Sequence, residues 1–278
     1  MANYGSSGVS RGRTAGLQSS TSLKFEPSAI PETTRETGRW TSAPRKPGTR
    51  HTYFRNTATP IGDNETVTSK PRWFPSSDLD TAFALARACH IDGTRKTDDT
   101  PYIAHLMGVS ALVIEHGGTE VQAAAALLHD TIEDTSMTHD RLELLIGKAV
   151  ADIVLDCTDD ADRKRNEDLT AEQRLADWYD RKVKYLDRLT HKPNGTPSLL
   201  VVLADKVHNG EATARDIQRC RAEGRDIAEF WAHFNAPRDK QHWWYGSLLQ
   251  ALESKTWSPA ALPLLARFRV AVAVIQSA

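Results

Sequence analysis

An apolar helical run that ends in a cluster of imidazole and carboxylate side chains constrains this chain more than any other segment. Residues 125–128 are Ala-Ala-Leu-Leu, and His129, Asp130, Glu133 and Asp134 follow within six residues. Placing three carboxylates beside buried leucines desolvates them, which a fold tolerates mainly when a cation or hydrogen bonds compensate. The segment therefore predicts a metal-centred active site at the end of a helix.

The N-terminal quarter of the chain differs in composition from the rest. Residues 1–75 are rich in Ser, Thr, Pro, Gly and Arg, lack sustained apolar periodicity and carry more basic than acidic side chains. We predict a disordered basic tail over residues 1–75 and one folded domain over residues 76–278. The tail is interpreted as a solvated extension rather than an arm for nucleic acid or another acidic partner.

Charge, cysteine content and hydropathy narrow the location and the partners. The formal net charge is −1, so removal of the basic tail leaves a mildly acidic domain for which no nucleic-acid binding is expected. Three scattered cysteines without a Cys-x-x-Cys pair are typical of a reducing cytoplasm. The tail has no secretory h-region, and the apolar run 260–275 is interrupted by two arginines and is too short to span a bilayer. We therefore expect a cytoplasmic protein without a membrane segment.

Apolar positions recur at helical spacing from about residue 78 onward, and no alternation of period two persists. The folded part is predicted to be all-α. Gly147, the pair Gly117-Gly118 and the turn 193–195 mark boundaries between helices. The expected helices are 78–91, 101–116, 119–130, 138–145, 147–157, 170–190, 197–214, 225–234, 238–253 and 258–276.

Two further residues are the best candidates to complete the metal site. His105 and Asp205 each lie in an otherwise apolar helical segment, as His129 and Asp130 do. Two imidazoles and two carboxylates provide mixed nitrogen and oxygen ligation with room for water. This set suits Mn²⁺, Fe²⁺ or Mg²⁺ better than a closed structural zinc site.

An open position on such an ion indicates catalysis, because the ion lowers the pKa of bound water. Glu133 lies one helical turn beyond His129 and is predicted to orient this water or to accept its proton. Asp134 is expected to support it. Arg181, Lys182 and Lys184 could supply phosphate contacts, but this charged segment is interpreted as a solvated helix face. Four other histidines are predicted to be structural or exposed, namely His90, His116, His139 and His208.

These motifs resemble the HD-domain superfamily, and more narrowly the hydrolase domain of the RelA/SpoT homologue family. Residues 90–96 resemble a stretch that begins with His and ends with Arg-Lys, and 101–105 match Pro-Tyr-Ile-x-His. Residues 126–135 match Ala-Leu-Leu-His-Asp-Thr-Val-Glu-Asp-Thr, and 203–209 match Leu-Ala-Asp-Lys-x-x-Asn. The resemblance covers roughly residues 78–252 and implies an HD-domain helical bundle without the family's synthetase domain.

The resemblance also implies an activity. Members of this family hydrolyse the 3′-pyrophosphate of guanosine tetraphosphate or pentaphosphate to give GDP or GTP, usually with manganese. Carried over to this chain, Arg95 and Lys96 would contact the purine base and Asn209 the ribose. Glu133 and Asp134 would position and activate water. The implied Mn²⁺ ligands are His105, His129, Asp130 and Asp205.

One departure from the family pattern leaves the substrate open. The loop 97–100 is one residue longer than usual and lacks the customary glycine, which could change the base preference, so adenosine analogues of the substrate need equal testing. A second alternative is another nucleotide, as in relatives resembling NADPH phosphatases. A catalytically silent nucleotide sensor is a third, although it predicts loss of the acids at 133 and 134. Some small members act as antitoxins to a toxic alarmone synthetase, which makes such a synthetase an expected functional partner.

Overall fold

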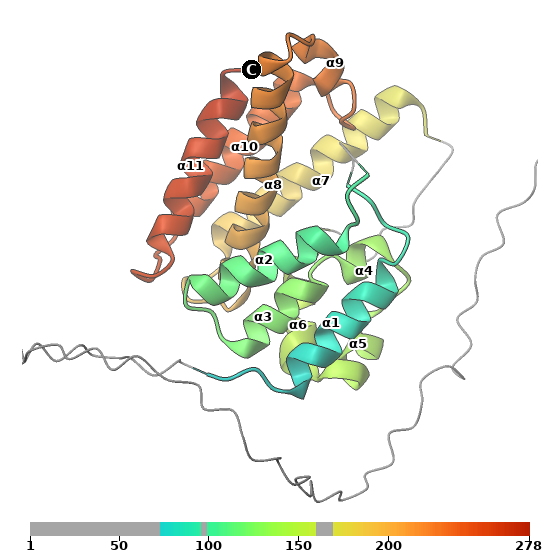
Figure 1. Cartoon of the computed structure of the whole chain (residues 1–278), viewed down its shortest axis with the longest axis vertical. Helices are drawn as coiled ribbons and strands as arrows, with labels where there is room; N and C mark the ends of the chain where they lie inside the picture. Colours follow the sequence, from blue (N-terminus) through green and yellow to red (C-terminus); the bar gives the residue numbers. More distant parts are fainter. Residues whose placement is uncertain (1–72, 96–98, 160–168) are drawn as a thin grey trace, which may run out of the picture. The chain divides into compact units, whose positions relative to one another are not determined.

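Helices make up all the regular secondary structure in the part of the chain that the structure describes. The computed structural model describes residues 73–95, 99–159 and 169–278 (Figure 1). Within these ranges there are eleven helices and an isolated β-bridge between Thr94 and Pro101, so the predicted all-α class is confirmed. The helices are α1 (Ser77–Cys89), α2 (Ile103–Glu115), α3 (Glu120–Leu128), α4 (Thr131–Asp134), α5 (His139–Ile146), α6 (Lys148–Cys157), α7 (Ala171–His191), α8 (Ser198–Ala222), α9 (Ile227–Trp231), α10 (Arg238–Glu253) and α11 (Leu262–Gln276).

Capping interactions define where the helices near the predicted site begin. Thr119 forms a capping box with Gln122 at the start of α3, and Thr170 begins α7 in the same way. Each box satisfies backbone N–H groups that have no partner inside the helix. Gly147 separates α5 from α6 as predicted, with a φ of 92° that favours glycine. These caps determine the lengths of helices whose ends carry predicted site residues.

One helix is longer than predicted and another was not predicted, each for a physical reason. The sequence predicts a helix over 197–214, but α8 continues to Ala222 because Ile217 and Cys220 extend its buried face. The single-turn helix α4 was not predicted, since four residues are too few to show a helical period. It begins at the turn after α3, where Asp130 has φ −95° and ψ −2°.

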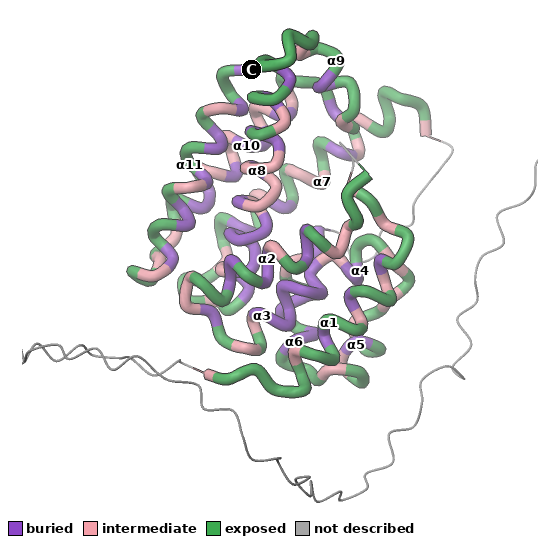
Figure 2. Tube along the Cα trace, in the orientation of Figure 1, coloured by how far each residue is buried: buried purple, intermediate pink, exposed green. Residues whose placement is uncertain are grey.

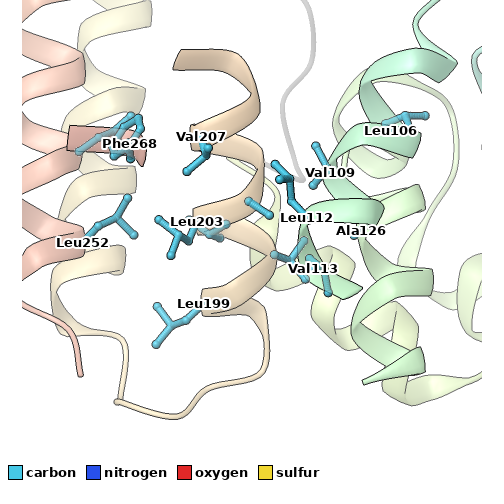
Figure 3. Close-up of a cluster of buried hydrophobic side chains, with 14 of the residues drawn as sticks. Leu106, Val109, Leu112, Val113, Ala126, Leu199, Leu203, Val207, Leu252 and Phe268 are labelled. Carbon is cyan, nitrogen blue, oxygen red and sulfur yellow. The ribbon is translucent and has the colours of Figure 1, made fainter. Parts of the chain in front are cut away.

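The long helix α8 lies between two groups of helices and forms the centre of the core. It packs against α2, α3 and α6 on one side and against α11 on another. Figure 3 shows Leu203 and Val207 on α8, with Phe268 on one side of this helix and Val109 and Val113 on the other. Buried residues dominate α3 and α8 in Figure 2. Because α3 is largely a run of alanines, its neighbours can approach closely, and the residues at its end are held firmly.

Trp73, the first residue that the structure describes, is packed against the helical domain. Trp73 packs against the core, and its Nε1 donates a hydrogen bond of 2.9 Å to the carbonyl oxygen of Gly118. Trp73 thus contacts the domain from a position before residue 76, and the boundary at 76 stays a prediction. The predicted disordered tail otherwise lies outside the described residues. Among the described helices, none has the length and hydrophobicity required to cross a bilayer.

Candidate metal centre

Three segments bring two imidazoles and two carboxylates together. His105 lies in the first turn of α2, His129 and Asp130 join α3 to α4, and Asp205 lies in the second turn of α8. Nε2 of His105 is 3.3 Å from Nε2 of His129 and 3.3 Å from Oδ1 of Asp205. Nε2 of His129 is 3.0 Å from Oδ2 of Asp130. The structure therefore places all four predicted ligands in one cluster.

The spacing of these atoms fits a shared divalent ion. Ligand atoms about 2.1 Å from an ion are roughly 3.0 Å apart at adjacent octahedral positions and roughly 3.4 Å apart in a tetrahedron. The two other contacts, from His105 to Asp130 and from His129 to Asp205, measure 3.6 Å and 3.5 Å. One ligand atom from each of His105, His129 and Asp130 lies within 4.8 Å of the others, and Asp205 joins this group through both imidazoles. This set of donors suits a metal ion.

Hydrogen bonds on the far side of each imidazole leave Nε2 available as a ligand. Nδ1 of His129 is 2.8 Å from the carbonyl oxygen of Ala126, which can only accept, so this nitrogen carries the proton. Nδ1 of His105 is 2.9 Å from Nδ1 of His208. His208, which was predicted to be structural or exposed, is half-buried and lies directly against this predicted ligand. Its position three residues after Asp205 on one helix was the available signal.

Each carboxylate of the cluster is held by further hydrogen bonds. The hydroxyl of Tyr102 donates to Oδ2 of Asp130 at 2.5 Å, and Nζ of Lys206 donates to Oδ2 of Asp205 at 2.7 Å. Burial raises the pKa of Asp205, but Lys206 and the imidazoles outweigh burial and hold this pKa well below its usual value. Burial is the main reason that the pKa of Tyr102 is raised. The carboxylates are therefore ionised and Tyr102 remains a donor.

The protonation of the cluster predicts how the stability of the metal-free protein depends on pH. Burial lowers the pKa of His129, but Asp130 and Asp205 outweigh burial and raise it well above 6.5. The stabilisation from protonated His129 is fully present below about pH 6.5 and is lost as the pH rises through the raised pKa. We expect the free energy of unfolding, measured with urea in EDTA, to fall between pH 6.5 and 9.5. The expected loss is about 1.4 kcal/mol for each unit by which the pKa is raised.

The same titration in saturating Mn²⁺ provides the control for this prediction. An ion bonded to Nε2 keeps His129 neutral at every pH of the series, so the alkaline loss of stability should disappear. The carboxylates do not contribute in this window, because groups whose pKa is lowered lose their stabilisation only as the pH falls into the acid range. A free energy of unfolding that rises from pH 6.5 to 9.5 in EDTA would contradict the assignment.

The two predicted water-activating acids lie on α4 beside the cluster. Glu133 and Asp134 are exposed and line a cavity of about 510 Å³ that also contains His129, Asp130 and Asp205. The backbone N–H of Asp159 donates to Oε2 of Glu133 at 3.2 Å. The turn at Asp130 therefore directs both acids into the space next to the candidate metal site, where water and substrate have access.

Helix α7 contributes the cationic side chain of Lys182 to the wall of this cavity. Lys182 lines the cavity and donates to Oδ2 of Asp159 at 2.8 Å, and burial lowers its pKa. The prediction of a solvated face over 181–184 is therefore wrong for Lys182. A signal was available, because the buried residues Trp178, Tyr185 and Leu189 define an inner helical face on which Lys182 also falls.

The predicted substrate-binding residues that the structure describes line two different cavities. Nη2 of Arg95 donates to Oδ1 of Asn209 at 3.1 Å, and Nδ2 of Asn209 donates to Oδ1 of Asp205 at 2.6 Å. Asn209 lines the metal cavity, whereas Arg95 lines a neighbouring cavity of about 490 Å³ together with His208. Lys96 lies outside the described residues. A chain of hydrogen bonds thus connects Arg95 with a predicted metal ligand.

Comparison with known proteins agrees with this helical bundle and its cluster of His and Asp residues. A family model described as an HD domain matches residues 82–241, and the chain belongs to the HD-domain family. It is 37% identical over 130 residues to the guanosine-3′,5′-bis(diphosphate) 3′-pyrophosphohydrolase MESH1 of Xenopus tropicalis, which covers 46% of this chain and 62% of the relative. It is 34% identical over 148 residues to MESH1 of Homo sapiens, covering 52% of this chain and 72% of the relative.

A solved structure extends the likeness to the fold. It is described by the statement that a metazoan ortholog of SpoT hydrolyzes ppGpp and plays a role in starvation responses. The two chains are 25% identical with a TM-score of 0.51, and the match covers 71% of this chain and 97% of that one. The HD-domain bundle predicted from the sequence is confirmed. The chain spans less than two thirds of the frog relative.

Proposed function

We propose that this chain is a metal-dependent hydrolase of guanosine 3′,5′-bis(diphosphate) that releases pyrophosphate and leaves GDP, or GTP from the pentaphosphate. The carrying observation is that the cluster of His105, His129, Asp130 and Asp205 adjoins a cavity that also presents acidic and cationic side chains. The printed names of the MESH1 relatives, which describe this activity, support the proposal.

The four clustered residues would hold the metal, for which we propose Mn²⁺, with Mg²⁺ or Fe²⁺ as alternatives. Two imidazole nitrogens and two carboxylate oxygens match the ligand preference of these ions. When bound, the ion would neutralise phosphate charge and lower the pKa of water in the site. The rest of the chemistry would fall to the surrounding side chains.

Glu133 would accept a proton from the attacking water, with Asp134 orienting the same molecule. The oxygen of that water forms a bond to the phosphorus next to the ribose 3′-oxygen, and the bond between this phosphorus and the 3′-oxygen breaks. The 3′-oxygen gains a proton, so the products are pyrophosphate and GDP. The fixed position of Glu133, whose Oε2 accepts from Asp159, supports its role as general base.

Lys182 and Lys206 would neutralise the departing pyrophosphate. Both line the metal cavity, with Nζ of Lys206 5.0 Å and Nζ of Lys182 6.0 Å from the centroid of the Tyr185 ring. Both side chains are largely buried, which strengthens the attraction between their ammonium groups and phosphate oxygens. This arrangement favours a substrate with several phosphates over a neutral one.

We propose that the purine base lies against Arg95, with Lys96 on the adjacent loop and Asn209 reaching the ribose. A planar guanidinium can stack on a purine, and the hydrogen bond from Arg95 to Asn209 keeps it in a defined orientation. The altered loop at 97–100 adjoins Arg95 in sequence. The adenosine analogue is therefore retained as a second substrate to test.

The proposal places the reaction in the cytoplasm. All three cysteines of the chain lie in its described part and are free, which suits a reducing compartment. A functional pairing with an alarmone synthetase, in which this chain removes the product of a toxic enzyme, is proposed from the family resemblance. Deletion of the gene for this chain should be harmful only to cells that make the synthetase.

The proposed function is tested by following products of the full-length, Mn²⁺-loaded protein. We expect pyrophosphate and GDP in equal amounts from guanosine 3′,5′-bis(diphosphate), with the adenosine analogue and NADPH assayed in parallel. Release of inorganic phosphate from NADPH without release of pyrophosphate would favour the phosphatase alternative. Tight nucleotide binding without any product, in protein with one equivalent of Mn²⁺, would favour the silent sensor and refute the hydrolase.

A further inference from the structure

A pair of histidines connects the candidate metal centre with the interface between α2 and α8. Nδ1 of His105 and Nδ1 of His208 are 2.9 Å apart, and their ring centroids are separated by 4.8 Å at an interplanar angle of 64°. His105 is almost fully buried and its Nε2 belongs to the cluster. His208 is half-buried and lies three residues after Asp205. The two rings therefore meet through their Nδ1 atoms, and Nδ1 of His105 is the ring nitrogen that lies outside the cluster.

The position of the proton between these nitrogens follows from the geometry of the cluster. A nitrogen that bonds a metal must present a lone pair, so Nε2 of His105 has to be unprotonated. The neutral ring of His105 then carries its proton on Nδ1 and donates it to His208. His208 must accept through Nδ1, which puts its own proton on Nε2. The opposite arrangement would place a proton on Nε2 of His105, where it blocks the ion.

The backbone of α2 approaches the ring of His208 closely at Gly108. A Cβ atom at Gly108 would lie 2.4 Å from Nε2 and 2.5 Å from Cδ2 of His208, so only a glycine accommodates the ring where it is. His105 and Gly108 are three residues apart on α2, as Asp205 and His208 are on α8. The first residue of each pair is a predicted ligand, and the second residues, Gly108 and His208, contact each other behind the ligands.

We infer that His208 is a positioning residue that holds His105 in the tautomer and orientation required to bind the metal. The inference rests on the proposed metal-dependent function, because it concerns one of the proposed ligands. Partners of this kind are usually carboxylates, backbone carbonyls or water. An imidazole can take the same role because a neutral ring has one nitrogen that accepts. Removing the acceptor should weaken metal binding without removing any ligand.

Three variants of the full chain separate this role from general packing. His208→Leu removes the acceptor, whereas His208→Asn retains an acceptor oxygen near the position of Nδ1. His116→Leu is the matched control, because His116 is a half-buried histidine at the C-terminal end of α2 whose Nδ1 bonds the backbone carbonyl of Leu112 and not a predicted ligand. We expect calorimetric Mn²⁺ affinity to fall about 10- to 100-fold in His208→Leu. It should stay within about threefold of wild type in His208→Asn and His116→Leu.

A measurement on the wild-type protein covers the case in which His208→Leu does not fold. In protein loaded with the diamagnetic ion Zn²⁺, ¹H–¹⁵N correlation spectra of the imidazoles should show His105 protonated at Nδ1 and His208 protonated at Nε2. A proton on Nδ1 of His208 would overturn the inference. So would wild-type Mn²⁺ affinity in a folded His208→Leu protein, or an equal loss in His116→Leu.

These outcomes are independent of the substrate. If the His208 variants lose Mn²⁺ as expected but wild type releases no pyrophosphate, the proposed hydrolysis fails and the role of His208 stands. If wild type releases pyrophosphate and His208→Leu binds Mn²⁺ normally, the role of His208 fails and the proposed hydrolysis stands.

Discussion

Glu133→Gln should retain Mn²⁺ but release pyrophosphate about 100- to 10,000-fold more slowly than wild type, the range expected for removal of a general base. Glu133 lies beside the ligand cluster without belonging to it, so metal affinity should not change. The glutamine oxygen can still accept the backbone N–H of Asp159, which holds Glu133 at 3.2 Å. The substitution thus removes proton transfer while preserving position. Steady-state release of pyrophosphate and calorimetric Mn²⁺ binding measure the two quantities separately.

Glu172→Gln is a suitable control for this prediction. Glu172 is an exposed acid in the first turn of α7, and it does not line the metal cavity. Its replacement should leave turnover within about twofold of wild type, because an exposed charge at a helix terminus contributes only a few tenths of a kcal/mol to about 1 kcal/mol of stability. Turnover of Glu133→Gln within threefold of wild type would assign proton transfer to Asp134 or to another group.

His129→Ala should lower Mn²⁺ affinity by about 100-fold or more, since loss of residues that merely support ligands already costs 10- to 100-fold. The metal-free protein should also lose about 3 kcal/mol at pH 6, because Asp130 and Asp205 lose a cationic partner in a buried site. Calorimetric titration with Mn²⁺ gives the affinity, and urea unfolding in EDTA gives the stability. Both effects have the same origin, which is the position of one imidazole between two carboxylates.

The surface histidine His139 provides the comparison. Its Nε2 is 2.9 Å from Oδ1 of Asp152, but both groups are partly exposed and lie on α5 and α6. His139→Ala should change stability by less than about 1 kcal/mol and should not change Mn²⁺ affinity. If His129→Ala bound Mn²⁺ within tenfold of wild type, His129 would not be a ligand.

The helices were predictable where apolar spacing persists over several turns. Ten of the segments expected from periodicity correspond to described helices, and capping residues such as Thr119 lie where those helices begin. The short helix α4 was not predictable in this way, because a single turn has no period to detect. The extension of α8 beyond residue 214 was also missed, since the contribution of Ile217 and Cys220 depends on what packs against them.

The candidate site was predictable in residue type but not in geometry. His105, His129, Asp130 and Asp205 stood out because polar groups in apolar helical segments require a reason to be buried. Their distances of 3.0 to 3.6 Å arise because α2, α3 and α8 pack against one another. Sequence separation carries no information about such distances.

The sequence by itself determined the class of fold and the kinds of side chain that a metal and its water require. These follow from local rules, namely the helical period and the cost of burying charge. Only the tertiary structure decided which residues surround Lys182 in the cavity and that His208 contacts His105. Both contacts join helices that are distant in sequence, and they exist because the core between those helices packs in one arrangement. A local pattern cannot specify a contact whose partner is set by packing elsewhere in the chain.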